Sequence, residues 1–124
     1  MKKGLDAKLI KSLAELGEEK HIDFKGRYFP QEFMMAHWGG YWIPSTIYEL
    51  MTALPLTLLN PRPGINKFYG KSTRWYPEVE LWQASYEQVD ETEHRDIFKA
   101  QTAPELVDAL GKLLVLIIKE GWLG

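Results

Sequence analysis

The strongest pattern of hydrophobic positions lies between Thr102 and Leu123. Apolar residues recur there with the three- and four-residue spacing that places them on one face of a helix. The residues on that face are Leu106, Leu110, Leu113 and Ile117. The run LLVLII within this segment is apolar on nearly all sides, so we expect the helix to be buried against more than one neighbour.

Signals at both ends of this segment predict where the helix begins and ends. Thr102 and Glu105 have the spacing of a capping box, in which each side chain binds the backbone amide of the other residue. Pro104 suits the first turn, because a proline lacks the N–H that would be unpaired there. Gly121 suits the C-terminal cap, and Trp122 after it can fold back onto the last turn.

The same helical spacing predicts two earlier helices. The first extends from Leu5 to Glu18 and ends near Gly17. The second extends from Pro44 to Leu54, where Pro55 stops it. Their apolar stripes are Leu5, Leu9, Leu13 and Leu16 in the first helix, and Ile47, Leu50, Met51 and Leu54 in the second.

Segments rich in β-branched and aromatic residues predict strands between the helices. We expect Glu78–Val89 and Thr92–Gln101 to form an antiparallel hairpin with a turn around Asp90. Asn60–Asn66 is dense in proline, glycine and asparagine and predicts a loop. The other predicted strands are His21–Pro30 bent at Gly26, Tyr41–Ile43 after a turn at Gly39 and Gly40, and Lys67–Tyr76 broken at Gly70, with a short extended piece at Leu54–Leu59.

Together these elements predict one domain over residues 1–124 with an α+β fold. We expect a small antiparallel sheet packed by helices, in helix–sheet–helix layers, with the amphipathic helix at the C-terminal end. The chain has no cysteine, which excludes disulfides and thiolate sites and fits a reducing compartment. The segment MKKGLDAKL has no apolar core of a secretory signal, and six consecutive apolar residues are far fewer than the ~20 of a membrane span. We therefore predict a cytoplasmic protein.

The segments EVELWQASY, TAPELVDALGKLL, KEGWL and IPSTIYELMTALP share one order of features. Strands rich in tryptophan and tyrosine lead into a helix with a Thr-x-Pro-Glu start, leucine repeats and a Glu-Gly-aromatic tail. This pattern resembles the phage ABA-sandwich domain family of small uncharacterised phage and prophage proteins. The resemblance covers Ile43–Leu123, whereas His21–Trp42 departs from it. The resemblance implies a small helix–sheet–helix protein of phage origin, and it implies no established chemistry, so no functional residue is carried over.

Few residues offer catalytic or metal chemistry. His21 with Asp23, and His94 with Asp96, each place an imidazole and a carboxylate on one side of a strand, so the two pairs could supply four metal ligands. Such spacing is common by chance, and the alternative is solvated pairs or structural hydrogen bonds. His37 has no nucleophile or carboxylate at fixed spacing. We therefore predict no catalytic, cofactor-binding or metal site.

One segment combines positive charge with aromatic rings, and it is the candidate binding surface. Between residues 62 and 76 there are four basic residues and no acidic one. Cations among aromatic rings can bind phosphates while bases stack, and the same residue types dominate protein interfaces. The proposed surface residues are Arg62, Lys67, Lys71, Arg74, Trp75 and Tyr76.

Two functions therefore remain open. The first is a phage-type accessory protein that binds a host or phage protein without catalysis, as a monomer or a homodimer. The second is a module that binds nucleotide or single-stranded nucleic acid through residues 62–76. The net charge of −2 disfavours the second, because nucleic-acid affinity depends on concentrated positive charge.

Overall fold

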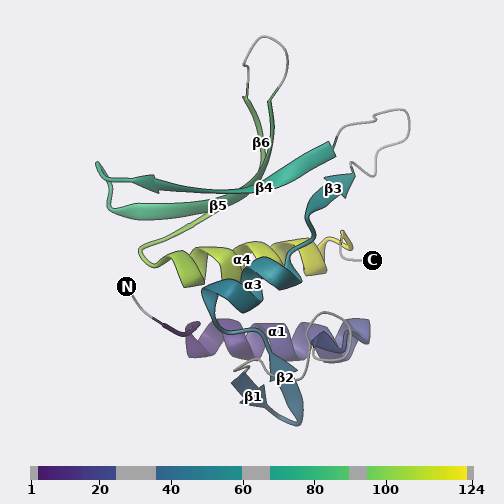
Figure 1. Ribbon diagram of the computed structural model, residues 1–124. Coiled ribbons are helices and arrows are strands. Elements are labelled where there is room, and N and C mark those ends of the chain that lie inside the picture. The colour runs from purple at the N-terminus through teal and green to yellow at the C-terminus, as the bar shows by residue number, and fades with distance from the viewer. Residues whose placement is uncertain (1–2, 25–35, 60–67, 90–94, 123–124) are drawn as a thin grey trace.

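The structure is a computed structural model, and it describes residues 3–24, 36–59, 68–89 and 95–122 (Figure 1). The described part of the chain contains helices and antiparallel strands, as the predicted α+β class requires. The elements are α1 (Ala7–Lys20), β1 (Ala36–Trp38), β2 (Tyr41–Ile43), α3 (Ile47–Ala53), β3 (Thr57–Leu59), β4 (Phe68–Tyr76), β5 (Leu81–Val89), β6 (Arg95–Ala103) and α4 (Leu106–Lys119).

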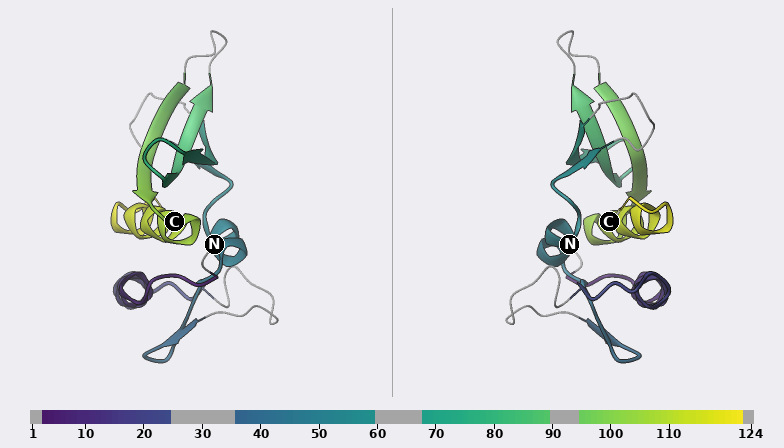
Figure 2. Two further views of the ribbon diagram at one scale, coloured as in Figure 1. Left: turned by 90° about the vertical axis from the view of Figure 1, so that its left-hand side faces the viewer. Right: turned by 90° about the vertical axis from the view of Figure 1, so that its right-hand side faces the viewer.

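The strands form two antiparallel sheets on either side of the helices. Strands β3, β4, β5 and β6 form a four-stranded sheet in chain order, and β1 pairs with β2 in a separate hairpin. Helices α3 and α4 lie beneath the four-stranded sheet, and α1 lies beneath them next to the β1–β2 hairpin (Figures 1 and 2). The C-terminal helix thus packs between the sheet on one side and α1 on the other.

The core forms where α4 meets its neighbours. Leu113, Leu114, Ile117 and Ile118 of the apolar run LLVLII are buried, as is Leu110 one turn earlier, whereas Val115 and Leu116 are only partly buried. Burial of each such side chain contributes about 1.5–3 kcal/mol relative to exposure. The sheet covers α4 with Ala84 and Tyr86 of β5, while Leu13 comes from α1 and Leu50 from α3. One helix therefore holds the other elements together.

The start of α4 corrects the predicted capping box. Thr102 belongs to β6 and pairs with Gln83 of β5, so its backbone is extended. The helix begins at Leu106, and its N-cap residue Glu105 makes no side-chain capping bond. Because strand pairing continues to Ala103, the helix cannot begin directly after Thr102, and Thr102 cannot be its N-cap.

The C-terminal end of α4 confirms the predicted glycine cap. Gly121 adopts φ +76°, which a residue without a Cβ tolerates. The Trp122 amide donates to the Ile117 carbonyl at 2.9 Å, and the Gly121 amide donates to Ile118 at 3.1 Å. These two bonds form a Schellman motif. The Trp122 ring then packs against Phe98 of β6, with 4.8 Å between centroids.

Helix α1 begins and ends differently from the prediction. Asp6 is its N-cap, and its carboxylate accepts from the Lys8 amide at 2.9 Å. The helix continues through Gly17 to Lys20, and His21 takes the left-handed position with φ +57°. Gly17 is buried, and a Cβ there would lie 3.5 Å from the ring of Phe24. That distance is an ordinary contact, so packing does not require a glycine here, and Gly17 does not end the helix.

Helix α3 is shorter than predicted and starts with a real capping box. The N-cap is Thr46, whose hydroxyl accepts from the Glu49 amide at 3.2 Å, while Glu49 accepts from the Thr46 amide at 3.2 Å. Leu54 is the C-cap residue, and Pro55 follows it as predicted.

Several strand predictions are confirmed and some are wrong. The pairing of Leu81–Val89 with Arg95–Ala103 confirms the predicted hairpin, although residues 78–80 belong to a turn. Gly70 does not break β4, because it pairs with Thr57 on one side and Glu87 on the other. Residues 21–23 form no strand, and Ile22 is buried after α1. The rest of that strand and the loop at residues 60–66 lie outside the described residues.

An irregularity in β6 turns one lysine toward α4. The register of β5 with β6 shifts between Ala84 and Tyr86, and Lys99 adopts φ +60° opposite this shift. Its Nζ forms an ion pair with Glu120 at the end of α4 and lies 4.7 Å from the Phe98 ring centre. Such a bulge in an edge strand discourages pairing with another sheet.

Candidate functional site

Lys71 of the predicted binding surface contacts the protein's own backbone. Its Nζ donates to the carbonyl oxygens of Met51 and Leu54, at 2.5 and 3.2 Å. These carbonyls lie at the C-terminal end of α3, where helical partners are lacking. Burial lowers the pKa of Lys71, because desolvation disfavours the charged amine. Lys71 thus joins the sheet to α3.

Arg74 forms a pair on the other face of the sheet. Its guanidinium donates to both carboxylate oxygens of Glu87 on β5, at 3.2 and 3.3 Å. The Glu87 carboxylate is mostly buried, so this pair is more protected from water than an ordinary surface pair.

The remaining residues of this surface do not gather in one place. Successive residues of a strand face opposite sides, so β4 directs Lys71 and Trp75 to one face and Arg74 and Tyr76 to the other. Trp75 packs on Trp82 of β5 with 5.3 Å between ring centroids and remains 41% exposed. Arg62 and Lys67 lie outside the described residues.

The β1–β2 hairpin exposes aromatic rings that sequence analysis did not single out. Trp38 is 44% exposed, Tyr41 36% and Trp42 43%. Gly39 and Gly40 have φ values of +55° and +88° and form the two-residue turn between the strands. In the sequence, the segment Trp-Gly-Gly-Tyr-Trp indicates this hairpin, because a Gly-Gly pair between two strands is typical of a two-residue turn.

Strand alternation gives the hairpin two different faces. Ile43 is fully buried and lies on the same side of β2 as Tyr41. Trp42 lies on the opposite side, opposite His37 of β1, and their rings are 4.9 Å apart. Ile43 thus anchors the hairpin to the core while Trp42 and His37 face outward.

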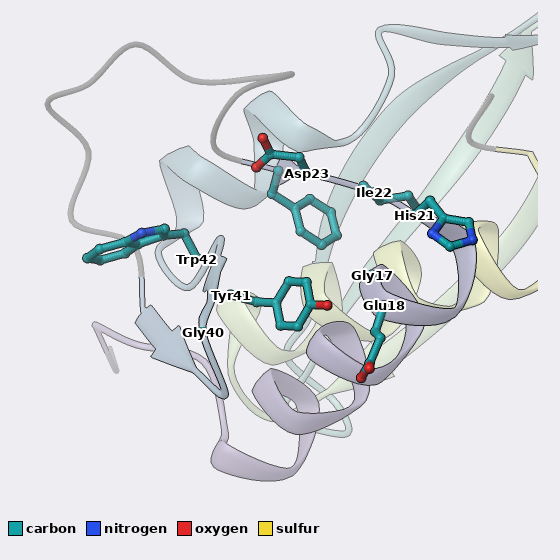
Figure 3. Close-up of a pocket in the computed structure, with 9 residues that line it drawn as sticks. Gly17, Glu18, His21, Ile22, Asp23, Gly40, Tyr41 and Trp42 are labelled. Carbon is teal, nitrogen blue, oxygen red and sulfur yellow. The ribbon is translucent and has the colours of Figure 1, made fainter.

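A cavity of about 360 Å³ lies between this hairpin and the end of α1 (Figure 3). Tyr41 points across it toward Glu18, whereas Trp42 points to the other side of β2. The cavity combines aromatic and charged groups, which suits recognition of a mixed polar and apolar ligand. The residues that border it are Gly17, Glu18, His21, Ile22, Asp23, Phe24, Gly40, Tyr41 and Trp42.

The residues of the two predicted His–Asp pairs lie in different environments. His21 and Asp23 both border the cavity, but they follow a helix end and do not lie on a strand. Asp96 accepts a hydrogen bond from the Tyr69 hydroxyl at 3.0 Å, and His94 lies outside the described residues. Within residues 3–24, 36–59, 68–89 and 95–122, no three His, Asp or Glu side chains gather to hold a metal ion.

No family model, no curated protein and no solved structure matches this chain. No helix in the described part is long and apolar enough to span a lipid bilayer.

Proposed function

We propose that this protein is a phage-type accessory protein that binds a host or phage protein in the host cytoplasm and performs no catalysis. The proposed contact surface is the β1–β2 hairpin. The observation that carries the proposal is the exposure of Trp38 and Tyr41 on one face of this hairpin and of Trp42 on its other face, beside a cavity.

Tryptophan and tyrosine support a protein partner because they bury large areas with little loss of side-chain entropy. These residue types recur among the few positions that supply most of an interface's binding energy. The buried Ile43 fixes the hairpin against the core, so its aromatic rings are held in place before a partner arrives. A surface held in advance loses less entropy on binding.

Nucleotide or single-stranded nucleic acid remains the alternative ligand, through residues 62–76. Lys71 and Arg74 contact a helix end and a carboxylate, so both would have to leave a protein partner to reach a phosphate. This cost favours the protein partner over the nucleic acid.

The proposal is tested by capture of a partner from infected host cells after nuclease treatment. We expect the wild-type protein and the Tyr48→Ala variant to recover the same specific protein, and Trp38→Ala/Trp42→Ala to lose it. Tyr48 is a suitable control because it is an exposed aromatic residue, at 67%, on α3. Circular dichroism should give similar melting temperatures for all three proteins.

Equal recovery by the double variant would exclude the hairpin as the contact surface. Two results together would favour the nucleic-acid alternative. The first is that no specific protein is recovered. The second is that a single-stranded oligonucleotide binds in a salt-sensitive manner and that Lys71→Glu/Arg74→Glu abolishes this binding.

A further inference from the structure

A groove of about 350 Å³ lies between α1 and α4. None of its residues belongs to the β1–β2 hairpin or to the cavity beside it. Leu9 comes from α1, Gln101 from β6, and the others from α4. The residues that border the groove are Leu9, Gln101, Lys112, Val115, Leu116 and Lys119.

Two contacts bring the helices together to form this groove. The Asp6 amide at the start of α1 donates to the Asp108 carboxylate of α4 at 2.9 Å. A Cβ at Gly111 would lie 2.3 Å from Leu5, so the missing side chain permits this close approach. The two helices run in the same direction, with α1 beneath α4 and α3 alongside α4 (Figures 1 and 2).

The floor of the groove is apolar and incompletely covered. Leu9, Val115 and Leu116 are only partly buried, in contrast to the fully buried Leu113 and Leu114 of the same helix. The floor can therefore accept apolar side chains from a ligand.

The charges along the groove have one sign. Lys112 and Lys119 border it, and no carboxylate of the described residues does. The Lys112 Nζ donates one of its three protons to the Thr102 carbonyl at 2.9 Å, so this exposed ammonium keeps two donors for a carboxylate. Seven residues of helix place the two lysines roughly 10 Å apart along α4.

We infer that this groove binds an acidic amphipathic helix of a protein partner. Apolar side chains of the helix occupy the floor, and carboxylates two turns apart meet Lys112 and Lys119. A nucleic acid would leave the apolar floor uncovered, whereas an amphipathic helix satisfies both the floor and the charges. The inference rests on the proposed function in assuming a protein partner, but it uses separate residues.

The test uses a labelled synthetic helix of about 20 residues, long enough to be appreciably helical. Glutamate stands at every seventh position, and leucines stand three and four residues after each glutamate. Fluorescence anisotropy measures its binding to the intact protein. We expect Lys112→Glu/Lys119→Glu to weaken binding about tenfold, and a peptide with glutamine for glutamate to bind about tenfold more weakly.

Lys3→Glu/Lys20→Glu is the matched control, because it changes the net charge equally at exposed residues outside the groove. It should bind the acidic peptide like the wild type. Lys119→Glu alone is a second variant, since Lys112 also bonds to Thr102.

Absence of peptide binding to the wild-type protein would overturn the inference. Equal binding of the glutamine peptide, or an equal loss in the control, would do the same. Trp38→Ala/Trp42→Ala should bind the peptide normally, so failure of the groove and failure of the hairpin can be distinguished.

Discussion

Tyr86 stabilises the junction between the sheet and the α3–β3 connection. Its ring is fully buried, and its hydroxyl donates to the Pro55 carbonyl at 2.7 Å. Burial raises the pKa of Tyr86 well above its usual value of 10.0. The hydroxyl therefore stays protonated in the folded protein after tyrosines of the unfolded chain begin to ionise.

This shift predicts a loss of stability in alkaline solution. Above pH 10 the folded state holds a proton that the unfolded state releases, so the free energy of unfolding falls as pH rises. One such proton lowers it by at most about 1.4 kcal/mol per pH unit. Tyr86→Phe should cost about 1 kcal/mol at neutral pH and remove this part of the alkaline slope. Urea titrations at several pH values measure both effects, with Tyr48→Phe as an exposed control.

The two carboxylate oxygens of the buried Glu49 differ in their hydrogen bonds. Its Oε1 accepts from the Ser45 and Thr46 amides at 3.1 and 3.2 Å, whereas Oε2 has no hydrogen-bond partner within the described structure. Glu49→Gln keeps an acceptor for both amides and should change the free energy of unfolding by about 1 kcal/mol or less. Glu49→Ala leaves both amides unpaired and should cost about 1–3 kcal/mol. Equal denaturation midpoints for the two variants would contradict this account.

At the scale of elements, two segments with the same capping-box spacing form different structures, which shows how far local sequence determines the fold. Thr46 with Glu49, and Thr102 with Glu105, have the same spacing, yet only the first forms a capping box. Thr102 is held in an extended conformation by pairing with Gln83, a contact distant in sequence. Local signals located each helix, but long-range pairing decided where α4 begins.

The same limit applies to the candidate surface. Composition identified Lys71 and Arg74 as cations near aromatic rings, but their partners come from α3 and β5. Sequence alone does not show which cations already have partners. The Trp-Gly-Gly-Tyr-Trp segment indicates a hairpin. It does not show that Ile43 is buried against the core and that the opposite face of the hairpin is directed outward.

Replacement of Lys71 tests how strongly the contact between β4 and α3 stabilises the fold. Lys71→Met keeps much of the side-chain volume but removes the bonds to Met51 and Leu54. Loss of bonds from a charged donor should lower the free energy of unfolding by about 1–2 kcal/mol, partly offset by removal of a desolvated charge. Guanidinium denaturation measures the change. Lys20→Met, at an exposed position, should have little effect, and a similar loss there would contradict the assignment.

At the scale of the molecule, α4 separates two packing layers. It contacts β5 and β6 of the sheet on one side and α1 on the other. On the sheet side, α4 is joined to β6 by the Lys99–Glu120 ion pair and by the hydrogen bond from Lys112 to the Thr102 carbonyl. On the α1 side, the hydrogen bond from the Asp6 amide to Asp108 accompanies close packing at the point where Leu5 meets Gly111. The layer that contains α1 should therefore separate from α4 more easily than the sheet does.

Gly111→Leu tests this difference between the two layers. The new side chain would overlap Leu5, since a Cβ alone lies 2.3 Å from it. Overpacking costs about 1–3 kcal/mol, and the gain in helix propensity offsets ~1 kcal/mol of it, so we expect a net loss of up to about 2 kcal/mol. Hydrogen exchange should show lost protection in α1 while β5 stays protected. Gly4→Leu, with open space around its Cβ, is the control. Leu5→Ala should partly rescue Gly111→Leu, and additive losses would show that the two residues do not share this contact.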